Sequence, residues 1–303
     1  MLLGLLQFSG APFNNPLIND TPGEVSGNFA NRNHFAVFLA LGCLIAPVWA
    51  LLDRREPGWR APAALGLMIL SILVILASGS RAGILTGGLA LGLGLAAVWR
   101  RIRRILQRYP RWMSFALPGA AVALVLLFVA ISVAAGRAVS VDRAFALDQG
   151  QDMRTRGLPT VLAMIREYLP FGSGLGGFDA VFRMHEPFAL LKPTYFNHAH
   201  NDLLEVVLDS GVGGAVLLLG ALGWWVRASE RAWRAGASGR SALPKLGSAI
   251  LLIVIIASAF DYPARTPMMM AVIVVAAVWL RQATTQHQMP SGGSALPTRG
   301  QHL

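Results

Sequence analysis

Seven stretches of this 303-residue chain are apolar and close to the length that crosses a membrane as a helix. A helix rises 1.5 Å per residue, so about 20 apolar residues span a hydrocarbon core of about 30 Å. The stretches are 34–52, 61–78, 82–99, 113–135, 204–226, 246–260 and 267–281. We therefore predict an all-α fold, a polytopic membrane helix bundle of about seven spans. The third stretch is rich in glycine, which favours close packing inside the bundle.

The composition agrees with a membrane protein. Hydrophobic residues make up 54% of the chain and charged residues 14%, whereas a soluble domain carries about 25% charged residues. So apolar a composition also excludes a disordered chain. Cys43 is the sole cysteine, which excludes a disulfide scaffold and a cysteine-rich zinc site.

The basic residues predict the orientation in the membrane. The formal net charge of +11 could by itself indicate a nucleic-acid partner. The arginines, however, cluster in the gaps 53–60, 100–112 and 227–245 between predicted spans. Such clusters mark cytoplasmic loops. We therefore predict no nucleic-acid binding, an external N-terminus and a cytoplasmic C-terminus.

The spans define one predicted transmembrane domain over residues 1–281, with a long external loop at 136–203. That loop is too long to be a mere connection, so it is the first place to look for function. Residues 282–303 are polar and rich in Gly, Ser and Gln, and we expect them to form a disordered cytoplasmic tail.

The external loop contains a predicted amphipathic helix at 155–168. Leu158, Leu162 and Ile165 lie on one face at helical spacing. Pro170 is expected to end the helix. A glycine-rich turn then follows, with the sequence FGSGLGGF.

The glycine-rich turn has two interpretations. Its backbone N–H groups, at Gly174 and Gly176 among others, could hold a phosphate, because successive amides form anion-binding concavities. The turn could also be a flexible connector. The sequence of the turn alone does not choose between them.

Two histidines, His198 and His200, lie before the fifth predicted span. They could be a zinc pair with His185 and Asp202, although the spacing is not a usual zinc pattern. They could also be ordinary hydrogen-bonding residues at the membrane interface. A general base is the sharper hypothesis, because an imidazole with a pKa of about 6.5 accepts protons at neutral pH.

Several arginines accompany these histidines on the predicted external side. They include Arg32, Arg81, Arg154, Arg156 and Arg265. Such side chains often reach toward lipid headgroups. Beside a histidine and a glycine turn, however, Arg81, Arg156 and Arg32 suit an anionic diphosphate, which guanidinium groups bind in a bidentate manner. With no clustered carboxylate motif, we expect them to act without a metal or other cofactor.

Four ordered stretches resemble the O-antigen ligase family of membrane enzymes. They are GNFANRNHFA at 27–36, SGSRAG at 78–83, Arg156 followed by LPFGSGLGGF at 169–178, and HNDLLE at 200–205 with Gly211. The set covers most of residues 27–281. Members of the family usually have several more N-terminal spans, so we expect this chain to lack them.

The resemblance implies a helical glycosyltransferase of the GT-C type. Its donor would be a glycan on undecaprenyl diphosphate, and its acceptor a hydroxyl of a glycan, a lipid A core or a protein. Transfer would occur at the periplasmic face of the bacterial inner membrane, in polysaccharide or lipopolysaccharide biosynthesis. By this resemblance, His200 stands at the position of the family's catalytic base, and Arg81 and Arg156 stand at the positions of its diphosphate-binding arginines.

Three other functions stay open at this point. A polymerase of the same superfamily would use the same donor with a different acceptor. A transporter would need ionisable residues in its spans, and Glu205 and Asp209 occur in the external third of the fifth span. A non-catalytic assembly scaffold is the third alternative.

Overall fold

The computed structural model describes residues 1–9, 25–51, 58–108, 153–191, 196–234 and 242–285, with isolated positions between 110 and 130. Within these ranges every regular element is a helix, which confirms the predicted all-α class. The helices are α1 (Leu2–Ser9), α2 (Arg32–Leu51), α3 (Arg60–Ser78), α4 (Arg81–Leu106), α7 (Met153–Tyr168), α8 (Phe178–His185), η2 (Phe188–Leu190), α9 (Asp202–Arg234), α10 (Ala242–Ser258), η4 (Pro263–Arg265) and α11 (Pro267–Thr285).

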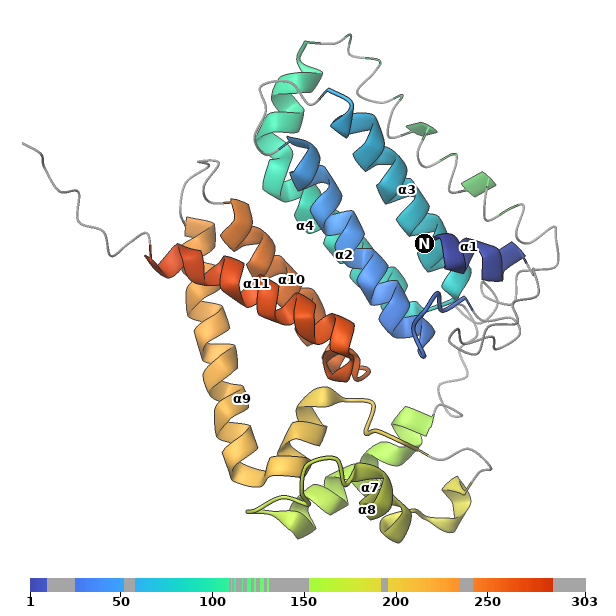
Figure 1. The fold of residues 1–303 in the computed structure, drawn as a ribbon, viewed down its shortest axis with the longest axis vertical. Helices are drawn as coiled ribbons and strands as arrows, with labels where there is room; N and C mark the ends of the chain where they lie inside the picture. Colours follow the sequence, from blue (N-terminus) through green and yellow to red (C-terminus); the bar gives the residue numbers. More distant parts are fainter. Residues whose placement is uncertain are drawn as a thin grey trace, which may run out of the picture.

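The long apolar helices form a membrane-spanning bundle (Figure 1). Helices α2, α3, α4 and α9 are long and apolar enough to cross a bilayer, and α10 and α11 are shorter apolar helices. The predicted spans thus correspond to described helices, except 113–135, which lies largely outside the described residues. Helix α11 continues to Thr285, and the predicted tail beyond it also lies outside them.

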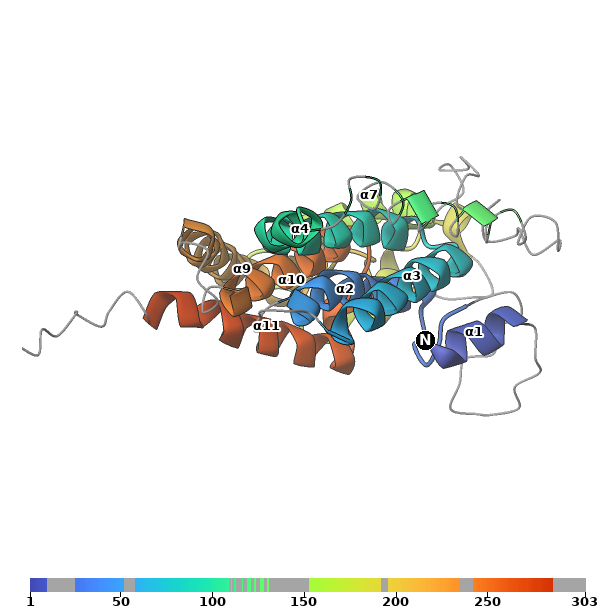
Figure 2. The same cartoon turned by 90° about the horizontal axis from the view of Figure 1, so that it is seen from above.

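Helix α10 is central in the described bundle, because it contacts α2, α4, α9 and α11. Seen from above, the bundle is shallow, with α4 and α11 on opposite faces and α2 and α10 between them (Figure 2). The glycine-rich helix α4 packs closely on α2, but it lies on one face of the described bundle and not in its interior, where the sequence predicts it. A Cβ added at Gly94 would lie 2.7 Å from the Leu44 carbonyl oxygen, and one at Gly83 would collide with Ala36.

The helix ends divide into two groups. Helices α2, α4, α9 and α11 begin, and α3 and α10 end, at one end of the bundle, here called the site end (Figure 1). The last turns of α4 and α9 lie at the opposite end and carry Arg103, Arg104, Arg231 and Arg234. The site end is therefore the end away from these clustered arginines.

Helix α9 is bent at Gly211, where φ is 58° and ψ is −143°. The bend corrects the predicted span at 204–226, because Glu205 and Asp209 belong to a short segment before the bend. The physical reason is a close backbone contact. The N–H of Val212 donates to the Pro170 carbonyl at 2.9 Å, and a Cβ at Gly211 would collide with that oxygen.

The chain between α4 and α9 supplies a small lobe at the site end, made of α7, α8, η2 and the first segment of α9. This site lobe has its own apolar core, in which Met164, Phe178, Phe182, Phe196 and Leu208 are buried together. Phe182 and Phe196 lie with ring centroids 5.0 Å apart. The lobe is thus a folded unit that can hold catalytic side chains in fixed positions.

Helix α7 confirms the predicted helix over 155–168 and ends two residues before Pro170. Its buried apolar side chains, however, are Val161 and Met164, and the neighbouring Thr160 is buried as well. Leu158 and Leu162, on the predicted apolar face, are each 40% exposed. The buried face is the neighbouring one, because the aromatic residues of α8 pack there.

Candidate active site

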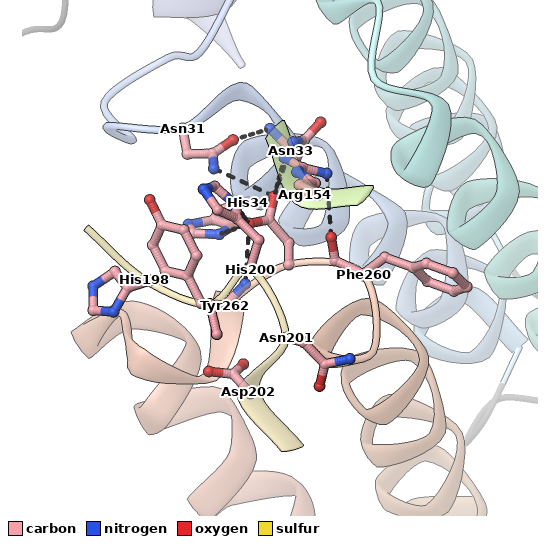
Figure 3. A network of polar contacts seen from close by, with 12 residues as sticks. Asn31, Asn33, His34, Arg154, His198, His200, Asn201, Asp202, Phe260 and Tyr262 are labelled. Carbon is pink, nitrogen blue, oxygen red and sulfur yellow. Dashed lines mark hydrogen bonds and ion pairs between the residues drawn. The ribbon is translucent and has the colours of Figure 1, made fainter. Parts of the chain in front are cut away.

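Asp261 is the centre of a polar network at the site end. The residue follows α10 and is 2% exposed. Its Oδ2 accepts hydrogen bonds from Asn33 at 2.9 Å, Arg154 at 3.0 Å and Asn31 at 3.3 Å. Asn33 lies in the first turn of α2 and Asn31 just before that helix, whereas Arg154 lies in the first turn of α7. Side chains from distant parts of the chain therefore converge here (Figure 3).

The other oxygen of Asp261, Oδ1, lies 2.9 Å from Nδ1 of His200 and accepts the backbone N–H of Tyr262 at 3.1 Å. Nε2 of His34, a residue that is 2% exposed, lies 3.7 Å from the same oxygen. An ionised carboxylate accepts and does not donate, so Nδ1 of His200 carries the proton. Nε2 of the neutral His200 ring is then an acceptor, and no described residue hydrogen-bonds to it.

The charge of Asp261 is stable. Burial raises its pKa, but the hydrogen bond from His200, the nearby imidazole of His34 and the charge of Arg154 outweigh that effect. Together they hold the pKa of this carboxyl well below its ordinary value of 3.8. Asp261 therefore stays ionised at physiological pH, where it orients the His200 ring and would stabilise its protonated form.

His200 is held in an uncommon backbone conformation, with φ at 49°. Non-glycine residues rarely adopt this region, and they persist there when their surroundings fix them. The ring contacts those of Phe196 and Tyr262, with centroid distances of 5.0 Å to each. The side chain is 17% exposed, so one edge of the imidazole stays accessible.

Asn201 fixes the backbone that follows His200. Its amide donates to the Ala259 carbonyl at 3.0 Å, and its Oδ1 accepts the N–H of Leu204 at 3.0 Å. The second bond caps the start of α9. The loop holding His200 is thereby tied to both α9 and the end of α10.

A second ionic network surrounds Arg265 of η4. Its guanidinium lies 3.3 Å from Asp202, 3.3 Å from Glu205 and 3.2 Å from Asp209. These three acids share one face of α9, before the bend. Glu205 also lies 2.8 Å from Nδ1 of His198. The carboxylates that could have indicated a transport pathway are therefore paired in the site lobe.

His198 and His200 thus pair with different carboxylates, Glu205 and Asp261. His198 pairs with Glu205, and its ring lies 4.3 Å from that of Tyr262. His185 instead contacts Glu167 at 2.9 Å. In the part of the chain that the structure describes, no three His, Cys, Asp or Glu side chains are arranged to hold a metal ion.

Ser80 connects the Asp261 network to α4. Its hydroxyl donates to Oδ1 of Asn33 at 2.7 Å and accepts the N–H of Gly83 at 3.0 Å, as the N-cap of the helix. Arg81, the next residue, therefore begins α4 at the same end of the bundle as His200, and its side chain is exposed. The positive end of the α4 dipole lies there too.

The other predicted site residues belong to the site lobe or to the start of α2. Arg156 donates to the Ala189 carbonyl at 2.8 Å, which ties α7 to η2. The N–H of Gly174 donates to the Asp209 carbonyl at 3.1 Å, and Gly176 is exposed with φ at 76°. Arg32 is the first residue of α2 and is half-buried. Their part in substrate binding stays a prediction.

Sequence reasoning does not identify Asp261 or Asn33 as site residues, and it names Arg154 only as one of several arginines on the external side. A signal for Asp261 was present. It is an isolated acid at the end of an apolar helix, where an unpaired buried carboxylate is costly, so it needs a cationic or donor partner elsewhere. Asn33 occurs in the stretch NRNH, in which Arg32 is selected from the sequence as the candidate site residue.

A comparison with protein families identifies a match. The family model described as O-antigen ligase matches residues 66–219, about half of the chain. The match runs from α3 through the site lobe and both histidines to just past the bend of α9. No protein of curated function matches the chain. On the family match, this membrane protein belongs to the O-antigen ligase family.

Proposed function

We propose that this chain is a membrane glycosyltransferase that moves a glycan from undecaprenyl diphosphate to an acceptor hydroxyl. We place the reaction on the periplasmic face of the bacterial inner membrane, because the site end lies opposite the clustered arginines. The observation that carries the proposal is the pair of His200 and ionised Asp261, which leaves Nε2 of the imidazole open. The acceptor would be a glycan, a lipid A core or a protein.

In the proposed reaction, Nε2 of His200 takes the proton of the acceptor hydroxyl as its oxygen attacks the anomeric carbon. A glycosidic bond forms while the bond between the anomeric carbon and the diphosphate oxygen breaks. The electron pair of that bond leaves with undecaprenyl diphosphate. Direct displacement inverts the anomeric configuration. Asp261 stabilises the imidazolium that forms, because its charge lies 2.9 Å from Nδ1.

Arg81 and Arg156 are the proposed ligands of the leaving diphosphate, with Arg32 in support. Arg81 is favoured because the positive end of α4 reinforces its charge and because Ser80 links α4 to the Asp261 network. Arg156 would exchange its hydrogen bond to Ala189, which is exposed, for phosphate oxygens.

In this proposal, the glycine-rich turn contributes less to binding the diphosphate than the arginines do. The N–H of Gly174 already donates to the Asp209 carbonyl. Gly176 is the better candidate of the two, because it is exposed and adopts a positive φ that can turn its amide outward. We therefore propose that the backbone N–H of Gly176, in preference to that of Gly174, binds the diphosphate.

The test of the base is transfer by the purified chain in proteoliposomes, with a synthetic lipid-diphosphate glycan and a soluble acceptor. His200→Ala should lower transfer by about 10²–10⁴-fold, the usual contribution of a general base. His198→Ala is the matched control, since His198 also pairs with a carboxylate, and should retain most activity. A large loss in His198→Ala with little loss in His200→Ala would contradict the assignment.

The test of the diphosphate ligands is donor dependence. Arg81→Ala and Arg156→Ala should each raise KM for the lipid-diphosphate donor far more than KM for the acceptor. Arg183→Ala is the control, because Arg183 forms an exposed pair with Asp179 on α8 at 3.0 Å. Equal donor KM values in all three variants would remove the diphosphate role.

A further inference from the structure

The glycine-rich turn exposes two large apolar side chains. Phe171 is 88% exposed and Leu175 is 84% exposed. Leu169, just before them, is 41% exposed. Large apolar groups gathered at one exposed place usually mark a contact with a partner or a membrane.

This exposure is fixed by the backbone of the turn. The N–H groups of Ser173 and Gly174 donate to the carbonyls of Leu208 and Asp209 at 2.8 and 3.1 Å. A Cβ at Gly172 would lie 2.6 Å from the Asp209 carbonyl oxygen, so the two backbones touch. The turn is therefore seated on the bend of α9, and its apolar side chains point away from the lobe.

The position of the bend sets the depth of the turn relative to the membrane. Residues 211–226 carry no charge and are followed by Arg227. As a helix they are about 24 Å long, which is shorter than a hydrocarbon core of about 30 Å. Val212 therefore lies at the edge of the hydrocarbon. The turn lies at the same depth, because Val212 donates to Pro170 at 2.9 Å.

We propose that Phe171 and Leu175 insert into the bilayer leaflet at the site end, so that the turn anchors the site lobe to lipid. The occupant is lipid because the exposed apolar surface of the turn continues onto α9. There, Val212, Val216 and Leu219 are 49%, 61% and 68% exposed. Side chains of this kind bind the boundary between headgroups and acyl chains. This anchor holds whether or not the lobe transfers glycans.

The test measures depth with nitroxide labels on the full chain in liposomes. Cys43 is replaced by Ser, and a single cysteine is then introduced by Phe171→Cys or Leu175→Cys. Leu217→Cys on α9 is the lipid-facing reference, since Leu217 is 76% exposed on a span. Arg183→Cys on α8 is the aqueous reference, since that charged side chain is 54% exposed.

The readout is the ratio of collision rates with oxygen, which concentrates in lipid, and with a water-soluble nickel chelate. The ratios at 171 and 175 should be several-fold above that at 183 and approach that at 217. Ratios equal to that at 183 would place the turn in water and overturn the proposal. Low collision rates with both reagents would show protein contact instead of lipid and would also overturn it.

Discussion

Nδ1 of His200 lies 2.9 Å from Oδ1 of Asp261, although 61 residues separate them in the chain. His200 precedes α9 and Asp261 follows α10, so the pair forms where the ends of these two helices meet. Asp202 strengthens the same junction, because its Oδ2 accepts the hydroxyl of Ser258 at 2.8 Å and the N–H of Ala264 at 3.0 Å. The geometry of the proposed base is thus set by helix packing.

Replacing Asp261 by Asn should lower glycan transfer by about 10²-fold or more, because the shape is kept but the charge that stabilises a protonated His200 is lost. The measurement is kcat at saturating donor. Because the two residues act as a unit, the double variant with His200→Ala should be no slower than His200→Ala alone. Losses that add fully in the double variant would argue against a coupled pair.

The low pKa of Asp261 predicts that the folded protein loses stability in acid. A carboxyl whose pKa is lower in the folded state stabilises the protein fully above its unfolded-state pKa. That contribution decreases as the pH falls through 3.8 toward the lower folded-state value. The gap in melting temperature between wild type and Asp261→Asn should therefore shrink as the pH falls below about pH 4. A gap that stayed constant from about pH 5 to pH 3 would mean that the pKa of Asp261 is not lowered.

Asn33→Ala should weaken the proposed base without touching substrate directly. Asn33 donates to Asp261 at 2.9 Å and accepts from Ser80 at 2.7 Å, so it positions both the carboxylate and the start of α4. We expect a loss in kcat of about 10- to 100-fold, the value of one hydrogen bond to a charged group. Ser80→Ala should have a smaller effect, because it leaves the Asn33–Asp261 bond in place. The reverse order would show that α4, not Asp261, is what Asn33 positions.

The sequence predicts the parts of this protein whose cause is local. Apolar length predicts the spans, and the helical spacing near 155–168 predicts α7. The bend at Gly211 was not predicted, because it depends on Pro170, a residue 41 positions earlier. The carbonyl of Pro170 accepts a hydrogen bond from the backbone at the bend. Asp261 was missed for the same reason. Its partners come from α2, α7 and the loop before α9, and a pattern along one helix cannot show a meeting of three segments.

Replacing Arg265 by Ala should destabilise the protein by about 3–5 kcal/mol, the cost of leaving buried charges without their partner. The variant leaves Asp202, Glu205 and Asp209 together, and each of these is at most 5% exposed. Thermal unfolding in detergent measures the loss. Arg183→Ala removes an exposed pair and should cost about 0–1 kcal/mol. Similar melting temperatures for the two variants would mean that the Arg265 network contributes little.

Gly211→Ala should be among the most damaging small substitutions in the chain. Its φ of 58° and ψ of −143° lie in a region that side chains rarely adopt. The added Cβ would also collide with the Pro170 carbonyl oxygen. We expect a loss of about 3 kcal/mol or more in unfolding free energy, because the bend must straighten or the turn must leave it.

Gly213→Ala provides the matched control, two residues further along the same helix. A Cβ there meets nothing within 4 Å, and alanine favours a helix over glycine by about 0.5–1 kcal/mol. Its melting temperature should therefore equal or exceed that of wild type. If Gly211→Ala unfolded at the wild-type temperature, the bend would not be held by the contact with Pro170. That result would also contradict the packing of the glycine-rich turn on α9 and the membrane depth that we infer from this packing.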